Sequence, residues 1–398
     1  MTHRERMLAA IRGEPTDRIP WAPRLDLWFA ANQWAGTLPA KYRNASLREL
    51  VDDLGIGYHA VVPDFRDLVR PDCDDRALGI FQAAAKPYHT VFDGVRRTSQ
   101  TEGDRTVVTY ETPCGALRTE TLYDEAMRRA GISISHVVEH PFKSPEDYPA
   151  LGFLFGHARA VPQPDGYQRF ADHVGDRGIA VAWITPSASP MHWIQRDLMP
   201  LDTFFYEMHD HPAEVALLAE QIGGYWQRLT DAACNCPADV VLVGANYDSM
   251  ITYPPFFADH ITPWLRSFAR ALHARGKCLL THTDGENTGL LEHYVAAEID
   301  IADSVCPAPM TKLTLHEVRD AFAGRVTIMG GIPSVALLPE SMSDRDFDAF
   351  LDDFLVQIGR GDHLILGISD TTPPGADFRR ILRIGQRVEA FGPVGGTP

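Results

Sequence analysis

The 398-residue chain is poor in basic side chains, in cysteine and in long hydrophobic runs. Its 37 lysine and arginine residues are outnumbered by 53 aspartate and glutamate residues, which gives a formal net charge of −16. No run of five basic residues interrupts this acidity. Because binding to phosphate backbones depends on clustered basic side chains, the composition argues against a nucleic-acid partner, and it disfavours a membrane surface for the same reason.

Membrane and export segments are also missing. No stretch approaches the roughly 18 consecutive apolar residues of a membrane span. The charged amino-terminal segment is not followed by the apolar stretch of an export signal. We therefore expect a cytoplasmic protein.

The six cysteines are few for this length, and only Cys234 and Cys236 are close in sequence. They lack the CxxC spacing of a zinc knuckle, and no second pair accompanies them. The sequence therefore predicts neither a disulfide framework nor a cysteine-based structural zinc site.

What the chain does contain is a rhythm of short apolar runs and longer segments of helical period, which is typical of repeated β–α units. Eight runs predict parallel strands, at residues 19–22, 59–62, 179–184, 240–243, 278–281, 299–302, 326–329 and 363–366. Eight strands with intervening helices favour a (β/α)8 TIM barrel as a single domain over residues 1–398, with its compact part at residues 15–392. An open doubly wound sheet is the alternative, although no GxGxxG or GxxxxGK[ST] motif favours it.

Helix boundaries support this pattern. Thr2 with Glu5 and Thr314 with Glu317 form capping-box sequences, which predict helices that begin after each threonine and end near Gly13 and Gly324.

One region has the period of two that is typical of strands. Residues 90–92, 106–110 and 116–122 alternate in this way, and residues 111–115 have turn chemistry. We therefore expect a β-hairpin insertion over residues 88–124, near the mouth of the barrel.

In a barrel, the carboxyl ends of all strands meet at one end, where active sites of this fold lie. Many polar residues follow the predicted strands, among them Asp64 after the second and Asp303 after the sixth. We predict that six of these side chains line one cavity: Arg24, Asp26, Asn246, Tyr247, Asp248 and His282.

The richest of these segments contains His282, Asp284 and Glu286 after the fifth strand. Residues two apart share a face in extended chain, so His282 and Asp284 could bind one metal ion, or Asp284 could orient the imidazole for proton transfer. Alternatively, Asp284 with the following glycine forms a turn, and His282 is a polar residue satisfied beneath the loop.

The fourth strand is followed by Asn246, Tyr247 and Asp248, which could bind substrate or transfer protons, or could merely cap a helix. For His192 the sequence favours a structural role, although the residue follows the third strand closely enough to reach the mouth.

Several segments together resemble the uroporphyrinogen decarboxylase superfamily, which includes that decarboxylase and the cobalamin-linked methyltransferases of methylotrophic and demethylating pathways. The matching segments are residues 4–13, 17–20, 111–115, 276–285, 325–332 and 372–373. They cover most of the chain in the right order. The resemblance implies a (β/α)8 barrel.

The decarboxylases carry an Arg-Gln-x-Gly-Arg-Tyr segment after the first strand, and this chain has Arg24-Leu-Asp-Leu-Trp28 there, with a single arginine. The methyltransferase branch is more similar. It holds zinc with a His-x-Cys-Gly segment and a further cysteine near the eighth strand. The histidine corresponds to His282, whereas Asp284 stands at the first cysteine and Asp370 follows the eighth strand. The resemblance thus implies either a zinc site with harder oxygen ligands, from His282, Asp284 and Asp370, or a site without metal.

The leading hypothesis is a methyltransferase that moves a methyl group between a small methylated compound and a corrinoid. The chain lacks the corrinoid-binding motif Asp-x-His-x-x-Gly, so the corrinoid would be carried by a separate protein. The alternative is a metal-independent decarboxylase or lyase, in which His282, Asp248 and Tyr247 transfer protons. In either reading, Arg24, Asp26, Asn246 and His192 are the candidate substrate-binding residues. A third possibility is a noncatalytic member that only binds a ligand.

Overall fold

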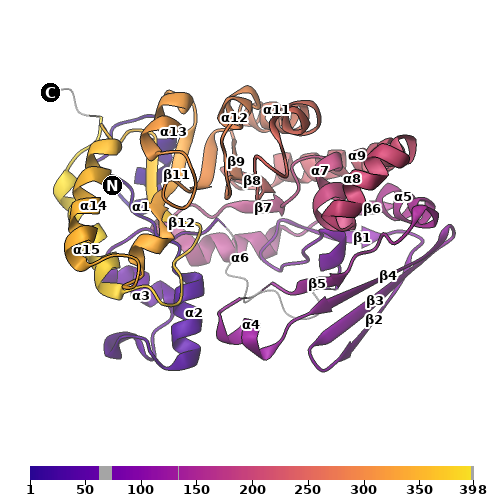
Figure 1. The fold of residues 1–398 in the computed structure, drawn as a ribbon, viewed down its shortest axis with the longest axis horizontal. Coiled ribbons are helices and arrows are strands. Elements are labelled where there is room, and N and C mark those ends of the chain that lie inside the picture. Colours follow the sequence, from indigo (N-terminus) through magenta and orange to yellow (C-terminus); the bar gives the residue numbers. More distant parts are fainter. Residues whose placement is uncertain (62–73, 133, 396–398) are drawn as a thin grey trace.

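A six-stranded parallel sheet lies at the centre of the protein in the computed structural model, which describes residues 1–61, 74–132 and 134–395 (Figure 1). Its strands follow one another in the order β12-β11-β10-β9-β8-β7, and every neighbouring pair is parallel. The strands are β7 (Ala182–Thr185), β8 (Val240–Ala245), β9 (Cys278–His282), β10 (Ile301–Val305), β11 (Thr327–Pro333) and β12 (Leu364–Ser369). These are the last six of the eight predicted strands.

The first predicted strand, residues 19–22, does not form a regular strand. Trp21 makes an isolated parallel bridge with Leu366 of β12. Leu366 donates a backbone hydrogen bond to the carbonyl of Pro20 at 2.8 Å and accepts one from Ala22 at 2.9 Å. Because proline has no N–H, Pro20 and Pro23 limit the ladder that this segment can form. The segment nevertheless extends the hydrogen bonding of the sheet beyond β12.

The second predicted strand, residues 59–62, is also irregular in its described part, and Val62 lies outside the described residues. Gly57 donates to the carbonyl of Trp21 at 2.7 Å, and Val181, which precedes β7, donates to the carbonyl of Ala60 at 3.1 Å. Backbone hydrogen bonds therefore continue from β12 through both amino-terminal segments to the beginning of β7.

The strands share an apolar core with the first helix. Alternate side chains of the six strands form one buried cluster that also contains Met7 and Ala10 of α1 (His3–Ile11). The strand residues at its centre are Trp183, Leu242, Leu280, Ile301, Met329 and Ile365. The opposite face of the strands packs against the helices in a second, larger cluster.

Helices connect the strands as the helical period predicts. In α9 (Pro212–Asn235), the stripe from Val215 to Leu229 is buried. Both predicted capping boxes are confirmed, at Thr2 before α1 and at Thr314 before α13. The other helices after β7 are α7 (Pro190–Trp193), α8 (Leu201–Asp210), α10 (Pro254–Phe256), α11 (Thr262–His273), α12 (Leu291–Ala296), α13 (Leu315–Phe322), α14 (Asp344–Gln357) and α15 (Phe378–Phe391). Those between α1 and β7 are α2 (Asp26–Ala35), α3 (Leu47–Leu54), α4 (Glu125–Arg129), α5 (Tyr148–Gly156) and α6 (Pro164–Val174).

A separate antiparallel sheet extends to one side of the parallel sheet (Figure 1). It contains β2 (Arg96–Glu102), β3 (Arg105–Thr112), β4 (Gly115–Leu122) and β5 (His136–Glu139), in that order. The expected turn at residues 111–115 joins β3 to β4. Two details differ from the expectation of a hairpin over residues 88–124. The sheet includes β5 beyond residue 124, and β1 (Tyr88–Phe92) pairs instead with β6 (Ala158–Pro162).

Within the described parts of the chain, every helix is too short or too polar to cross a membrane.

Candidate functional site

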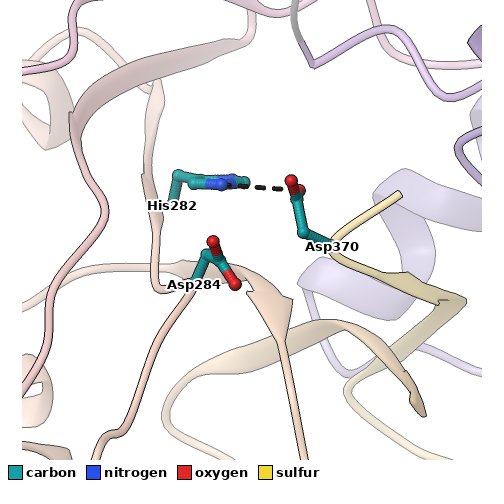
Figure 2. Close-up of side chains that lie close together, drawn as sticks. All are labelled: His282, Asp284 and Asp370. Atoms are coloured by element: carbon teal, nitrogen blue, oxygen red, sulfur yellow. Dashed lines mark ion pairs between the residues drawn. The ribbon is translucent and has the colours of Figure 1, made fainter. Parts of the chain in front are cut away.

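Three side chains converge at the carboxyl ends of two parallel strands. His282 is the last residue of β9, Asp284 follows it by two positions, and Asp370 comes directly after β12. One potential ligand atom from each lies within 4.8 Å of the other two. The Nε2 atom of His282 is 3.5 Å from Oδ1 of Asp370, and Figure 2 shows the Asp284 carboxylate beside this pair. The set offers one imidazole nitrogen and two carboxylates, a combination that suits a divalent metal ion.

Asp303 contacts the Nδ1 atom of the His282 ring. In the parallel pairing of β9 and β10, Asp303 lies directly beside His282. Oδ2 of Asp303 is 2.6 Å from Nδ1 of His282. Oδ1 of the same carboxylate is 3.5 Å from Nε2 of His59, whose side chain is 8% exposed. The remaining nitrogen of His282 therefore faces Asp370.

A bulge in β10 follows Asp303 and turns the next side chain toward the same place. The pairing with β11 shifts between Asp303 and Val305, and Ser304 between them has a φ of 59°, in the left-handed region. The hydroxyl of Ser304 is thereby able to donate to Oδ1 of Asp370 at 2.8 Å.

Arg24 completes the surroundings of Asp370. Its Nη1 atom donates to Oδ1 of Asp370 at 2.8 Å, and its Nε atom donates to Asp26 at 3.1 Å. The guanidinium is largely buried, and burial alone would lower the pKa of Arg24, but the charges of Asp26 and Asp370 raise it above its usual value. Arg24, Asp26 and Asp370 thus form one group of ion pairs.

The titratable groups perturb one another strongly. Burial would lower the pKa of His282, but the hydrogen bond with Asp303 and the nearby carboxylate charges raise it above its ordinary value. Burial would raise the pKa of Asp303, but hydrogen bonds from His282 and His59 hold it well below the usual range. Burial is likewise opposed at Asp370, where Arg24 and His282 lower the pKa, whereas burial dominates at Asp284 and raises its pKa. Perturbations of this kind are concentrated at functional sites.

Asn246 also belongs to this group. Its backbone N–H donates to the carbonyl of His282 at 3.0 Å, and its side-chain amide lies 3.4 Å from Oδ2 of Asp284. The residue has a φ of 60°, which asparagine tolerates better than most residues. Two residues earlier, Gly244 has a φ of 84°, and a Cβ there would lie only 1.9 Å from the hydroxyl of Tyr247. The end of β8 therefore requires glycine at this position.

Tyr247 and Asp248 are held in other directions. The Tyr247 hydroxyl is fully buried and lies 2.6 Å from Oγ1 of Thr281, and burial raises its pKa well above the usual range. Asp248 accepts backbone hydrogen bonds from Met250 at 2.8 Å and from Glu286 at 3.3 Å. Among the described residues, neither side chain makes a hydrogen bond to His282, Asp284 or Asp370. These contacts are those of a buried packing residue and of a loop cap.

His192 is buried in the same layer as Tyr247, with 5.6 Å between the two ring centroids. Its Nδ1 atom accepts a hydrogen bond from the backbone of Ala188 at 3.0 Å. Burial lowers the pKa of His192 to about 3, so the ring stays neutral at physiological pH. Its surroundings are those of a structural histidine.

Sequence reasoning assigned no role to several neighbours of the cluster. Asp303 was recognised only as a polar residue at a strand end, and His59 only as part of a strand. Cys306 is a further buried neighbour after β10, where burial and the charges of Asp284 and Asp370 raise the pKa of its thiol to about 12. Equal distances from the starts of adjacent parallel strands could have paired Asp303 with His282. Asp64 lies outside the described residues.

Comparison with known proteins gives similarity to solved structures. No family model matches the chain. No curated protein matches it either. Among solved structures, a methyltransferase from Methanosarcina mazei is similar with a TM-score of 0.53, over 98% of this chain and 99% of that one, at 13% sequence identity. At this identity the likeness concerns the fold alone, which the two chains share over nearly their whole lengths.

Proposed function

We propose that this protein is a methyltransferase of the uroporphyrinogen decarboxylase superfamily type. It moves a methyl group between a small methylated compound and a corrinoid that a separate protein carries. The observation behind the proposal is the cluster of His282, Asp284 and Asp370, on a chain that has the fold of a methyltransferase over its full length. Residues 276–285, which contain His282 and Asp284, also resemble the superfamily in sequence, and this supports a methyltransferase activity for the shared fold.

The proposal includes a single (β/α)8 barrel, with residues 19–22 and the described part of residues 59–62 in the places of its first two strands. Backbone hydrogen bonds connect these segments to β12 on one side and to the residue before β7 on the other. Side chains from β7 and β12, the two outer strands of the six, share the same apolar cluster, as expected when a sheet closes around its own side chains. Residues 88–124 belong to an insertion in this barrel.

The donor atoms fit zinc. Zinc accepts imidazole nitrogen and carboxylate oxygen, and catalytic zinc sites have three protein ligands with a fourth position left open. His282, Asp284 and Asp370 would hold the ion, and a bound zinc ion would supply a Lewis acid that stabilises negative charge on the heteroatom that gives or accepts the methyl group. The excess of carboxylates around His282 favours a divalent cation electrostatically.

The surrounding side chains orient these ligands. Arg24 and Ser304 both donate to Oδ1 of Asp370, which fixes that carboxylate and keeps it ionised. The side-chain amide of Asn246 donates to Oδ2 of Asp284 at 3.4 Å and so helps to orient that carboxylate. In the demethylating direction, the bond between methyl carbon and heteroatom would break with both electrons left on the heteroatom, and a cobalt(I) corrinoid on the partner protein would supply the electron pair that accepts the methyl group.

The test combines metal analysis with methyl transfer. Protein purified without chelators is expected to contain close to one equivalent of zinc and to methylate cob(I)alamin from a panel of methylated amines, thiols and phenols. We expect His282→Ala and Asp370→Asn to lower both zinc content and turnover at least 100-fold. His273→Ala is the matched control, because His273 also pairs with an aspartate, Asp300, at 2.8 Å but lies away from the cluster. Equal activity in His282→Ala and wild type would refute the proposal.

A second candidate is a metal-independent decarboxylase or lyase acting on a small organic acid. The observation that favours it is the short contact between His282 and Asp303, because a histidine held by a carboxylate is also a common acid–base arrangement. Active enzyme that contains less than about one-tenth equivalent of any transition metal would decide for this alternative.

A further inference from the structure

We infer that Asp303 is a positioning residue, which fixes the ring of His282 so that Nε2 points toward Asp284 and Asp370. The inference rests on the proposed function, because it assigns the residue that prepares His282 as a ligand. Asp303 itself touches neither Asp284 nor Asp370 through any hydrogen bond among the described residues.

The backbone places Asp303 for this task. Strands β9 and β10 pair so that Asp303 and His282 are direct neighbours. The N–H of Thr283 donates to the carbonyl of Asp303 at 2.7 Å, and the Thr283 hydroxyl donates to the same oxygen at 2.9 Å. These two bonds lock the ends of the strands together, so the carboxylate and the imidazole keep one relative position.

Both oxygens of the carboxylate have a partner. Oδ2 lies 2.6 Å from Nδ1 of His282, and Oδ1 lies 3.5 Å from Nε2 of His59. The side chain of Asp303 is 2% exposed, so water cannot replace either partner easily. Rotation of the carboxylate would break one contact with a histidine inside the protein. His59 therefore helps to hold Asp303, as Asp303 holds His282.

The chemistry of imidazole explains why this matters. A neutral ring carries one proton, and only the other nitrogen has a lone pair for a metal ion. A hydrogen bond from Nδ1 to Asp303 keeps the proton on that side and leaves the Nε2 lone pair directed at the cluster. Such outer partners usually change metal affinity 10- to 100-fold when they are removed.

A merely structural role would satisfy the same hydrogen bonds, so the test needs a readout specific to the ring. The first measurement is nitrogen NMR of ¹⁵N-histidine-labelled, metal-free protein, with His282→Gln to assign the signal. In wild type we expect a Nδ1–H proton of His282 that is protected from exchange. In Asp303→Ala this protection should be lost, and in Asp303→Asn it should be weakened.

The second measurement is zinc affinity by competition with a chromophoric chelator, together with the visible spectrum of cobalt(II) bound in place of zinc. Asp303→Ala should bind zinc 10- to 100-fold more weakly and alter the cobalt bands. The matched control is Asp300→Asn, which removes a carboxylate just before β10. The Asp300 carboxylate pairs with His273 and accepts a hydrogen bond from the backbone of Leu279. This control variant should leave the His282 signal and the zinc affinity unchanged.

The outcomes separate the two proposals. An unchanged Nδ1–H signal in Asp303→Ala would overturn the positioning role, and so would unchanged zinc affinity in a wild type that binds zinc. If wild type binds no metal but the signal depends on Asp303, the positioning role stands and the zinc part of the proposed function fails. If Asp303→Ala does not fold, Asp303→Asn supplies the same comparison, because it keeps the size of the side chain and removes its charge.

Discussion

The guanidinium of Arg24 donates a 2.8 Å hydrogen bond to the carboxylate of Asp370, although the two residues are 346 positions apart in the chain. Leu366, four positions before Asp370, brings them together, because its backbone forms hydrogen bonds with residues 20–22. The side chains of Arg24 and Asp370 are 14% and 30% exposed. A largely buried pair of this kind is costly to break from one side, because the remaining charge loses its partner.

We predict that Arg24→Gln lowers the free energy of unfolding by about 1–3 kcal/mol at pH 7, the cost of leaving a largely buried polar group without its partner. The pKa of Asp370 lies below its ordinary value despite burial, owing to the charges of Arg24 and His282. A depressed carboxylate pKa contributes stability that is present above the unfolded-state pKa and is lost as the pH falls through the folded-state value. Without Arg24 this contribution shrinks, so urea unfolding should show a difference from wild type that is constant from pH 7 down to about pH 4 and narrows as the pH falls below the ordinary pKa of 3.8. A difference that widens in acid would contradict the assignment.

His192 leads to a second pH-dependent prediction. Burial lowers its pKa from 6.5 to about 3, so the unfolded chain binds a proton that the folded protein refuses between these values. The histidine therefore costs the folded state nothing above pH 6.5 and destabilises it progressively as the pH falls toward 3. We expect His192→Asn, which keeps an acceptor near the N–H of Ala188, to flatten the acid side of the stability profile. Parallel profiles for variant and wild type between pH 4 and pH 6.5 would disprove it.

The residues that converge on the cluster could be foreseen only in part. His282, Asp284 and Asp370 follow apolar runs that predict parallel strands, and the carboxyl ends of such strands lie at one end of the sheet. Asp303 follows the same rule, but its role depends on register, since a shift by one residue would turn its side chain to the other face. The only sequence signal for that register is that Asp303 and His282 lie equally far from the starts of their predicted strands, at residues 299 and 278.

The direction in which a side chain points after a strand is equally hard to predict from the sequence. Tyr247 and Asp248 follow β8 as a polar pair, but the φ values of Gly244 and Asn246 turn the chain so that the tyrosine hydroxyl meets Thr281.

In the fold, the last six strands are predictable because they are continuous apolar runs. Residues 19–22 contain Pro20 and are followed by Pro23, neither of which has a backbone donor, and for this reason the run forms only an isolated bridge.

Lys86 gives a prediction away from the cluster. Its ammonium group is fully buried, donates to the carbonyl of Ile184 at 2.8 Å and to the hydroxyl of Tyr88 at 3.0 Å, and burial lowers its pKa to about 7. The unfolded chain holds this proton up to about pH 10.5, so wild-type stability gains from rising pH between 7 and 10.5.

We expect Lys86→Met to fold, because the hydroxyl of Tyr88 still donates to the carbonyl of Ile184 at 2.6 Å. The variant should be favoured over wild type most at pH 7 and less at pH 9.5, as measured by urea unfolding at both values. A stability difference between Lys86→Met and wild type that is constant with pH would show that Lys86 keeps its proton in the folded state.

Tyr247 separates the candidate roles at the end of β8. Its hydroxyl lies 2.6 Å from Oγ1 of Thr281 and is fully buried, so Tyr247→Phe should lower the free energy of unfolding by about 0.5–1.5 kcal/mol, as for loss of one hydrogen bond. We expect methyl transfer to stay within about threefold of wild type, because a change of that size corresponds to less than 1 kcal/mol in the barrier.

The comparison with His282→Ala makes the Tyr247 result decisive. A proton-transferring tyrosine contributes about 10²- to 10⁴-fold to the rate, and its loss would change the pH profile of kcat/KM. A packing tyrosine changes stability and leaves that profile in place. If Tyr247→Phe loses activity 100-fold while its unfolding midpoint is unchanged, the hydroxyl must act in the reaction, and the buried contact with Thr281 must open during turnover. The structure favours the opposite result, because the hydroxyl is enclosed between Thr281, Gly244 and Ala188, where even one added carbon atom at Gly244 would collide with it.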